Sequence, residues 1–196
     1  MKTFLLGLTT AALAVAVPAG AVTVVGATKV TITNVANTWL QVAEVQAFNF
    51  ASTNVALATN GGSAVGGTGT WDGTSTAGKA IDGNTGGGFY TDTIFHPGTE
   101  AGGFLDVSFA APTTLQSLTI WGRTDCCTDR DVYNVTIFGG STVLYSGTIN
   151  AAGQPGTVTF DAPAIVPEPQ SWALMIVGFG LVGVSLRRRK LVAVSA

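Results

Sequence analysis

The sequence predicts an all-β protein built as an antiparallel β-sandwich. Between residues 22 and 166 the chain is rich in Gly, Thr, Val and Ser, a composition typical of strands joined by turns. Short runs of β-forming residues follow one another there, and glycine or proline separates them. Because the same stretch contains no convincing amphipathic helix, the antiparallel sandwich conflicts least with the sequence.

The first 21 residues have the pattern of an export signal. Lys2 supplies a positive charge, residues 4–17 form the apolar region, and Ala19-Gly20-Ala21 provides an A-x-A cleavage site. We therefore expect the mature chain to begin at Val22. Export would carry the chain into an oxidising compartment, where a disulfide can persist.

Residues 22–166 are long enough to form one domain with its own core. This segment carries ten acidic and four basic residues, which gives a net charge of about −6 and argues against nucleic acid as a partner. Its first expected strand, at residues 29–34, alternates polar and apolar side chains.

A second strand, expected at residues 39–48, places Glu44 on a face that is otherwise apolar. A carboxylate buried on such a face is costly unless it is paired or bound to a metal. The alternative is a β-bulge that turns Glu44 toward solvent. Residues 54–78 then form loops around short strands.

Two loops that follow carry residue types suited to binding. Residues 79–85 contain an Asp-Gly-Asn turn, which is usually only a turn but presents several oxygen atoms together. The only histidine, His96, precedes a proline and a glycine, which favours an extended loop. A lone histidine is more often structural than a ligand, so both interpretations stay open.

The remaining strands occur at the spacing of a sandwich. They are expected at residues 104–109, 115–122, 132–138, 142–148 and 157–160, with Pro112 and glycine-rich positions marking the turns between them.

The only two cysteines, Cys126 and Cys127, lie in the loop between the strands expected at 115–122 and 132–138. Arg123 and Arg130 bracket them and are half of the basic residues of the domain. Consecutive Cα atoms are about 3.8 Å apart, so the pair bridges to itself, stays reduced, or links to another molecule. The charged residues around it favour an exposed loop.

The C-terminal segment carries a second processing signal. Pro167-Glu168-Pro169 precedes an apolar run at residues 172–186, and Arg187-Arg188-Arg189-Lys190 follows it. As a helix the run reaches about 22 Å, somewhat short of a hydrocarbon core of about 30 Å. The basic cluster favours a cytoplasmic end, so the residues alone indicate a simple membrane anchor.

The order of these residues resembles the PEP-CTERM sorting signal in its PEPxxWA form, with Trp172-Ala173 after the Pro-Glu-Pro. The resemblance implies a Gram-negative bacterium and a transmembrane helix that anchors the chain transiently in the inner membrane. It also implies cleavage by an exosortase and release to the cell surface or extracellular polysaccharide matrix. The expected organisation is a signal peptide at 1–21, a domain at 22–166 and a sorting segment at 167–196.

Within the domain, the AIDGN turn, the downstream histidine and the R-x-D-C-C-x-x-R loop resemble the fucolectins of the discoidin (F5/8 type C) superfamily. The resemblance covers about residues 39–160 and implies a jelly-roll β-sandwich. It also implies a sugar site made by His96, Arg123 and Arg130, by the edge of a vicinal Cys126–Cys127 disulfide, and by Asp125 as an orienting residue.

The same resemblance implies a structural calcium ion held by hard oxygen ligands. These would be the side chains of Glu44, Asp82 and Thr93 and the carbonyls of Ala43, Lys79 and Asn84. One feature differs from the fucolectins: their strand resembling VAEVQAF lies at the C-terminal end, whereas here it precedes the AIDGN turn.

From these patterns we expect an exported carbohydrate-binding module that takes a fucose-like sugar or polysaccharide. The alternative is a non-catalytic structural or adhesive matrix protein with no monosaccharide pocket. An enzyme is not expected, because glycoside hydrolysis needs two facing carboxylates and nucleophilic catalysis needs a base held against a nucleophile.

Overall fold

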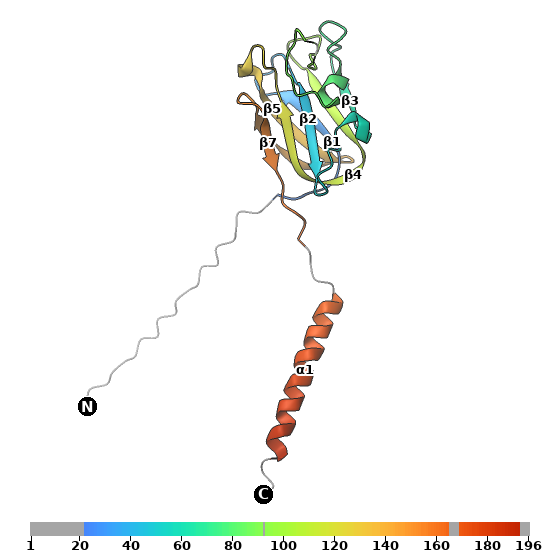
Figure 1. Cartoon of the computed structure of the whole chain (residues 1–196), viewed down its shortest axis with the longest axis vertical. Helices are drawn as coiled ribbons and strands as arrows, with labels where there is room; N and C mark the ends of the chain where they lie inside the picture. The colour runs from blue at the N-terminus through green and yellow to red at the C-terminus, as the bar shows by residue number, and fades with distance from the viewer. Residues whose placement is uncertain (1–21, 92, 165–168, 193–196) are drawn as a thin grey trace, which may run out of the picture. The chain divides into compact units, whose positions relative to one another are not determined.

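The structure is a computed structural model that describes residues 22–91, 93–164 and 169–192. The predicted signal peptide lies outside the described residues, as do Pro167, Glu168 and residues 193–196 of the sorting segment. The chain divides into two units, with the boundary in the sequence between Ala162 and Pro163 (Figure 1).

Among the described residues of the first unit, seven strands form an antiparallel sheet, which confirms the predicted all-β class. The hydrogen-bonded order is β2-β4-β1-β5-β6, and β3 and β7 both pair with β4. The strands are β1 (Val24–Asn34), β2 (Glu44–Asn49), β3 (Ser63–Gly66), β4 (Phe104–Trp121), β5 (Val132–Gly139), β6 (Thr142–Asn150) and β7 (Gly156–Thr159).

Strand β4 is 18 residues long and changes neighbours along its length. Its first part pairs with β3 and its last part with β2 and β7, while β1 accompanies it with two register shifts. The turn predicted at Pro112 is therefore wrong, because the two expected strands are one. Pro112 lies where neither β2 nor β3 pairs with β4, and proline is tolerated at such an irregularity.

The core is built from alternating residues of the paired strands. Val30 and Ile32 of β1 and Val135 and Ile137 of β5 are fully buried. Their spacing follows from the two-residue period of a strand, which sends every second side chain to the same face. This core holds the strand ends, and with them the loops described below, in place.

The strand predicted at residues 39–48 begins only at Glu44. The residues before it leave β4, and Val42 instead makes an isolated bridge to Phe95 through N–H···O bonds of 3.1 and 2.7 Å. This bridge brings the segment around Gln41 beside the histidine loop. No local sequence pattern predicts such a pairing, because its two residues are 53 positions apart in the chain.

The two ends of the sandwich meet. The amide of Asp161 donates a hydrogen bond of 3.0 Å to the carbonyl of Val22. Strand β1 starts and β7 finishes near this point, and in Figure 1 the chain enters and leaves the strand unit at one end.

The second unit contains α1 (Pro169–Val192), preceded by a short linker. None of the described helices is long and apolar enough to cross a membrane. The transmembrane helix predicted for this segment is thus not borne out. Its apolar run at residues 172–186 spans about 22 Å before the basic cluster begins, which is short of a hydrocarbon core.

Candidate functional site

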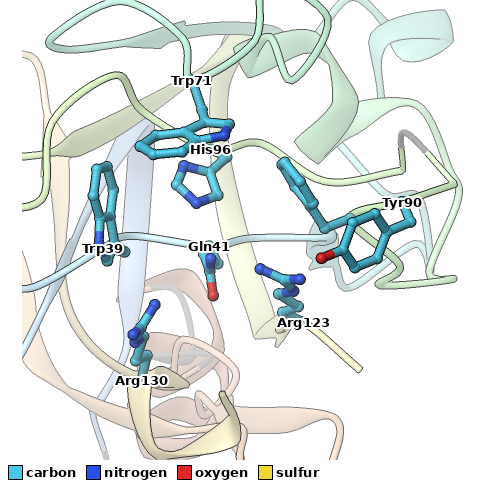
Figure 2. A pocket seen from close by; sticks show the side chains of 8 residues that line it. Trp39, Gln41, Trp71, Tyr90, His96, Arg123 and Arg130 are labelled. Atoms are coloured by element: carbon cyan, nitrogen blue, oxygen red, sulfur yellow. The ribbon is translucent and has the colours of Figure 1, made fainter. Parts of the chain in front are cut away.

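A pocket of about 190 Å³ lies among the loops at one edge of the sandwich. Antiparallel pairing of Glu44 with Trp121 sets the start of β2 beside the end of β4, so the residues just outside these strands come together. The pocket is lined by Trp39, Gln41, Trp71, Phe89, Tyr90, His96, Arg123 and Arg130 (Figure 2). The three side chains predicted as the core of a sugar site therefore meet in one place.

His96 is buried in an aromatic surround. Its ring centroid lies 5.0 Å from that of Trp39, 5.4 Å from that of Trp71 and 5.5 Å from that of Phe89. The Nδ1 atom lies 2.9 Å from the carbonyl oxygen of Pro97, which can only accept, so Nδ1 carries the proton.

Burial lowers the pKa of His96, and the positive charges of Arg123 and Arg130 lower it further, so the ring is neutral at pH 7. A neutral ring with its proton on Nδ1 leaves Nε2 as a hydrogen-bond acceptor. Main-chain bonds hold the loop in this position, because the His96 amide donates to Ser75 and its carbonyl accepts from Trp71.

Arg123 lies two residues after the end of β4 and is buried, although the charged residues around the cysteines predicted an exposed loop. Its guanidinium lies 4.8 Å from the centroid of the Phe89 ring and forms an ion pair with Asp125. Cation–π contact and ion pairing together shield the charge from water. This explains how an arginine is buried in the loop.

Asp125 connects two loops of the pocket. Besides its ion pair with Arg123, its carboxylate accepts hydrogen bonds from the amides of Phe89 at 3.0 Å and Tyr90 at 3.5 Å. Partial burial alone would raise the pKa of Asp125, but the hydrogen bonds from Arg123 and the two amides bring it below its ordinary value. Asp125 is therefore ionised at neutral pH and fixes Arg123 relative to the aromatic pair.

Arg130 ends a 3-10 turn at Thr128–Arg130 and is half-buried. Its carbonyl accepts a hydrogen bond of 2.5 Å from the Asn34 side chain, which ties the turn to β1. Within residues 22–91, 93–164 and 169–192 its guanidinium has no carboxylate at ion-pair distance. Arg130 thus contributes an uncompensated positive charge to the pocket.

Cys126 and Cys127 form a disulfide with each other. Cys127 has a φ of 62° and turns the chain into the 3-10 turn that carries Arg130. Neither cysteine is among the residues that line the pocket, so the structure places the disulfide in the loop between the two arginines and not in the pocket wall.

Asp131 lies fully buried beneath the loop. Its carboxylate accepts hydrogen bonds from the hydroxyl of Tyr133 at 3.0 Å, the amide of Arg123 at 3.4 Å and the side chain of Gln154 at 3.2 Å. Burial raises its pKa to about 6. The Tyr133 hydroxyl oxygen also lies 2.5 Å from the carbonyl oxygen of Gln41, so its one proton is shared between Asp131 and Gln41 and one network supports two sides of the pocket.

Five lining residues were missed by the sequence reasoning. Trp71 is the one large side chain of residues 54–78, and Phe89-Tyr90 is an aromatic pair in a glycine-rich stretch, so both carried a usable signal. Trp39 and Gln41 carried none, because they occupy a run that resembles an ordinary strand. Only the Val42–Phe95 bridge brings them into the pocket.

The predicted calcium ligands lie around the AIDGN turn. Glu44 is fully buried, and its Oε2 accepts a hydrogen bond of 3.2 Å from the amide of Gly83. Its Oε1 has no partner among the described residues. Burial raises the pKa of Glu44 to about 8, and the negative charge of Asp82 contributes to the rise. The structure thus brings Glu44 and the turn together and leaves one carboxylate oxygen free.

The side-chain oxygens of two other predicted ligands, Thr93 and Asp82, already take part in hydrogen bonds. Thr93 Oγ1 exchanges hydrogen bonds of 2.9 Å with the backbone of Gly88, and Asp82 accepts a bond of 2.8 Å from the amide of Asn84. Among the described residues no cluster of three or more His, Cys, Asp or Glu side chains could hold a metal. The predicted set has only two such side chains and relies on carbonyls for the rest.

Residues 166–190 match the PEP-CTERM protein-sorting motif. This match confirms the predicted PEP-CTERM signal, which indicates export and exosortase-dependent sorting, as in Gram-negative bacteria, with transient anchoring at the membrane. Searches of curated proteins and of solved structures returned no match for the chain.

The PEP-CTERM motif overlaps α1. Within this helix Trp172, Ala173 and Arg187 are exposed. The motif thus belongs to the second unit, whereas the described residues that line the pocket belong to the first.

Proposed function

We propose that residues 22–166 form an exported carbohydrate-binding module of the fucose-lectin type. The observation that carries this proposal is the convergence on one pocket of His96 from one loop with Arg123 and Arg130 from the loop between β4 and β5. At about 190 Å³ the pocket lies below the range of about 300–1,000 Å³ of drug-sized sites, which suits a single sugar ring.

The polar groups of the pocket match the needs of a sugar. The guanidinium groups of Arg123 and Arg130 donate hydrogen bonds to hydroxyl or ring oxygens, and Nε2 of neutral His96 accepts one from a hydroxyl. The aromatic side chains supply the apolar surface on which the C–H face of a ring can pack. The resemblance of the loops to fucolectins points to fucose, whose methyl group needs such a surface.

A binding role is favoured over catalysis by the composition of the pocket. Among its described lining residues none is Asp or Glu, whereas glycoside hydrolysis requires a pair of carboxyl groups. The cysteines nearby are joined in a disulfide, which leaves no thiolate to act as a nucleophile. We therefore propose a lectin and not a hydrolase.

The test is calorimetric titration of the protein with L-fucose. Arg130→Ala should weaken binding by about tenfold or more, because a charged hydrogen-bond donor contributes about 1.5–3 kcal/mol. Arg130 is preferred to Arg123 for this test, since the buried ion pair of Arg123 also supports the loop. Lys29→Ala, which removes a cation outside the pocket lining, is the control.

Absence of sugar binding at millimolar concentration would contradict the lectin proposal. Retention of the double variant Arg123→Ala, Arg130→Ala in the extracellular matrix would then favour a structural or adhesive role.

We also propose a structural calcium ion between β2 and the AIDGN turn. The unpartnered oxygen of buried Glu44 supports it, because a cation would supply the missing partner. Glu44, Asp82 and Thr93 would hold the ion with the carbonyls of Ala43, Lys79 and Asn84. The ion would lock the turn against the strand that leads into the pocket.

A further inference from the structure

Gln41 is a polar residue of the pocket that a structural role does not explain. Its side chain is 1% exposed, and neither the amide nitrogen nor the carbonyl oxygen has a hydrogen-bond partner in the part of the chain that the structure describes. Leaving a buried polar group unpaired costs about 1–3 kcal/mol, and folded proteins rarely do so. In Figure 2 the carboxamide lies between the side chains of Arg130 and Arg123. A ligand in the pocket would therefore meet it.

The pocket also has a charge of its own. Two guanidinium groups line it, His96 is neutral, and no described lining residue is acidic. Asp125 compensates Arg123, whereas Arg130 has no described carboxylate partner. This local positive charge lies in a domain whose net charge is about −6, so it is a feature of the site and not of the whole surface.

We propose that the pocket binds an acidic sugar, a hexuronic acid unit, with the carboxylate held between Arg130 and Gln41. The inference rests on the proposed sugar-binding function and names its ligand class. The guanidinium fork of Arg130 donates to the carboxylate oxygens, and the amide nitrogen of Gln41 donates a further hydrogen bond. The Gln41 carbonyl oxygen then accepts from a neighbouring hydroxyl, which satisfies both ends of the buried carboxamide.

The aromatic wall suits the ring of the same ligand. Trp39 and Trp71 meet edge to face at 4.9 Å between ring centroids, and Trp71 is 54% exposed. Their surfaces lie on the side of the pocket opposite Arg123 (Figure 2). A sugar packed on this wall keeps one edge toward the two arginines and Gln41, where its polar groups are needed.

The test compares sugars that differ only at C6. Methyl D-galacturonoside is titrated against methyl D-galactoside, methyl D-glucuronoside against methyl D-glucoside, and L-fucose serves as the neutral reference. We expect at least one uronide to bind about tenfold more tightly than its neutral match, as a charge-assisted hydrogen bond contributes about 1.5–3 kcal/mol. Raising the salt from about 20 to about 300 mM should weaken uronide binding more than neutral binding.

Three variants locate the effect. Arg130→Gln should remove the preference for the uronide, whereas Lys29→Gln, which removes a cation that does not line the pocket, should keep it. Gln41→Leu should weaken uronide binding by about tenfold without lowering the melting temperature, because the protein itself gives the carboxamide no partner. A lower melting temperature with unchanged affinity would make Gln41 structural and overturn its assignment.

The outcomes separate the two proposals. Neutral sugars that bind as well as or better than their uronides would overturn the acidic ligand and leave the lectin function intact. Binding of uronides without L-fucose would support the acidic ligand and replace the fucose-type specificity. Failure of every sugar to bind would overturn both.

Discussion

Burial fixes the protonation state of His96 and with it the contact that this side chain offers to a ligand. The surrounding aromatic rings exclude water, and the Pro97 carbonyl holds the proton on Nδ1. The pKa of the ring is lowered by this burial first and by Arg123 and Arg130 next; the carboxylate of Asp72 acts in the opposite direction. Nε2 is thus an acceptor over the whole neutral pH range.

The loss of sugar affinity in acid should therefore occur at a lower pH than it would with a histidine of ordinary pKa. Protonation converts Nε2 from an acceptor to a donor, and the lowered pKa shifts this change below the usual value of about 6.5. We expect constant affinity from pH 8 to about 6.5 and a fall at lower pH, measured by calorimetry.

His96→Gln is the matched control, because its carboxamide offers an acceptor that does not titrate. Its affinity should stay flat where that of the wild type falls. A parallel fall of both proteins would assign the pH response to Asp131, whose pKa is about 6, and contradict the role given to His96.

Rare residue types made part of the site predictable at this scale. His96, Arg123 and Arg130 stand out because the domain has one histidine and four basic residues. Gln41 does not stand out, since a glutamine in a strand usually faces solvent. Its burial depends on the bridge from Val42 to Phe95, a contact that no local pattern encodes.

At the scale of elements, β2 joins the pocket to the AIDGN turn. The strand starts at Glu44, whose side chain accepts a hydrogen bond from the amide of Gly83, while Trp39 and Gln41 a few residues earlier line the pocket. Gly83 has a φ of 90°, a conformation that glycine adopts without strain, and so the turn can present its amide to the carboxylate.

Rising pH should destabilise this region, whereas bound calcium should stabilise it. Without an ion, the raised pKa of Glu44 means that folding favours the protonated carboxyl, so stability is greatest below about 4.5 and is lost as pH rises toward about 8. Bound calcium pairs with the charged form and adds about 2.7 kcal/mol at 100 times its Kd. In EDTA the melting temperature should thus fall as the pH rises. Calcium should raise the melting temperature above its value in EDTA, and this difference should be largest at pH 8.

Glu44→Gln should abolish both responses, because it neither titrates nor provides a charged ligand. Asp72→Asn, which alters an exposed acid, is the control variant. Equal melting curves in calcium and EDTA for the wild-type protein would contradict the calcium site.

The strands show which parts of a fold local patterns can predict. The alternation in β5 identifies it directly, because Tyr133, Val135 and Ile137 are buried and their neighbours are not, and β6 pairs with it as a hairpin. The continuity of β4 through Pro112 escaped prediction, since it depends on the neighbours that leave and join the strand on either side of the proline. Sequence patterns predict periodicity well but not the partners of a strand.

At the scale of the whole molecule, the pocket and the sorting motif lie in different units. The strand unit carries the pocket, and the PEP-CTERM motif lies in the helix that follows the linker. The linker before this helix contains Pro163 and Pro167, and α1 begins at Pro169. Sorting and binding should accordingly be separable by mutation.

Replacing Pro167, Glu168 and Pro169 with alanine should block processing, because exosortase-dependent sorting requires the motif. The variant should remain cell-associated with its C-terminal segment intact, whereas we expect the wild type to be shortened at its C-terminus. Cell fractionation with mass spectrometry of the intact protein measures both. Arg130→Ala, whose motif is untouched, should be processed normally, and wild-type processing of the alanine variant would refute this division of roles.

The hydrogen bond between Asp161 and Val22 places the first and last residues of the sandwich next to each other, so the path of the chain almost closes into a ring. A ring has no compulsory starting point: if these ends were joined, the chain could be opened at the β5–β6 hairpin around Gly140 with every strand pair kept. The position of a strand in the sequence is then independent of its position in the sheet.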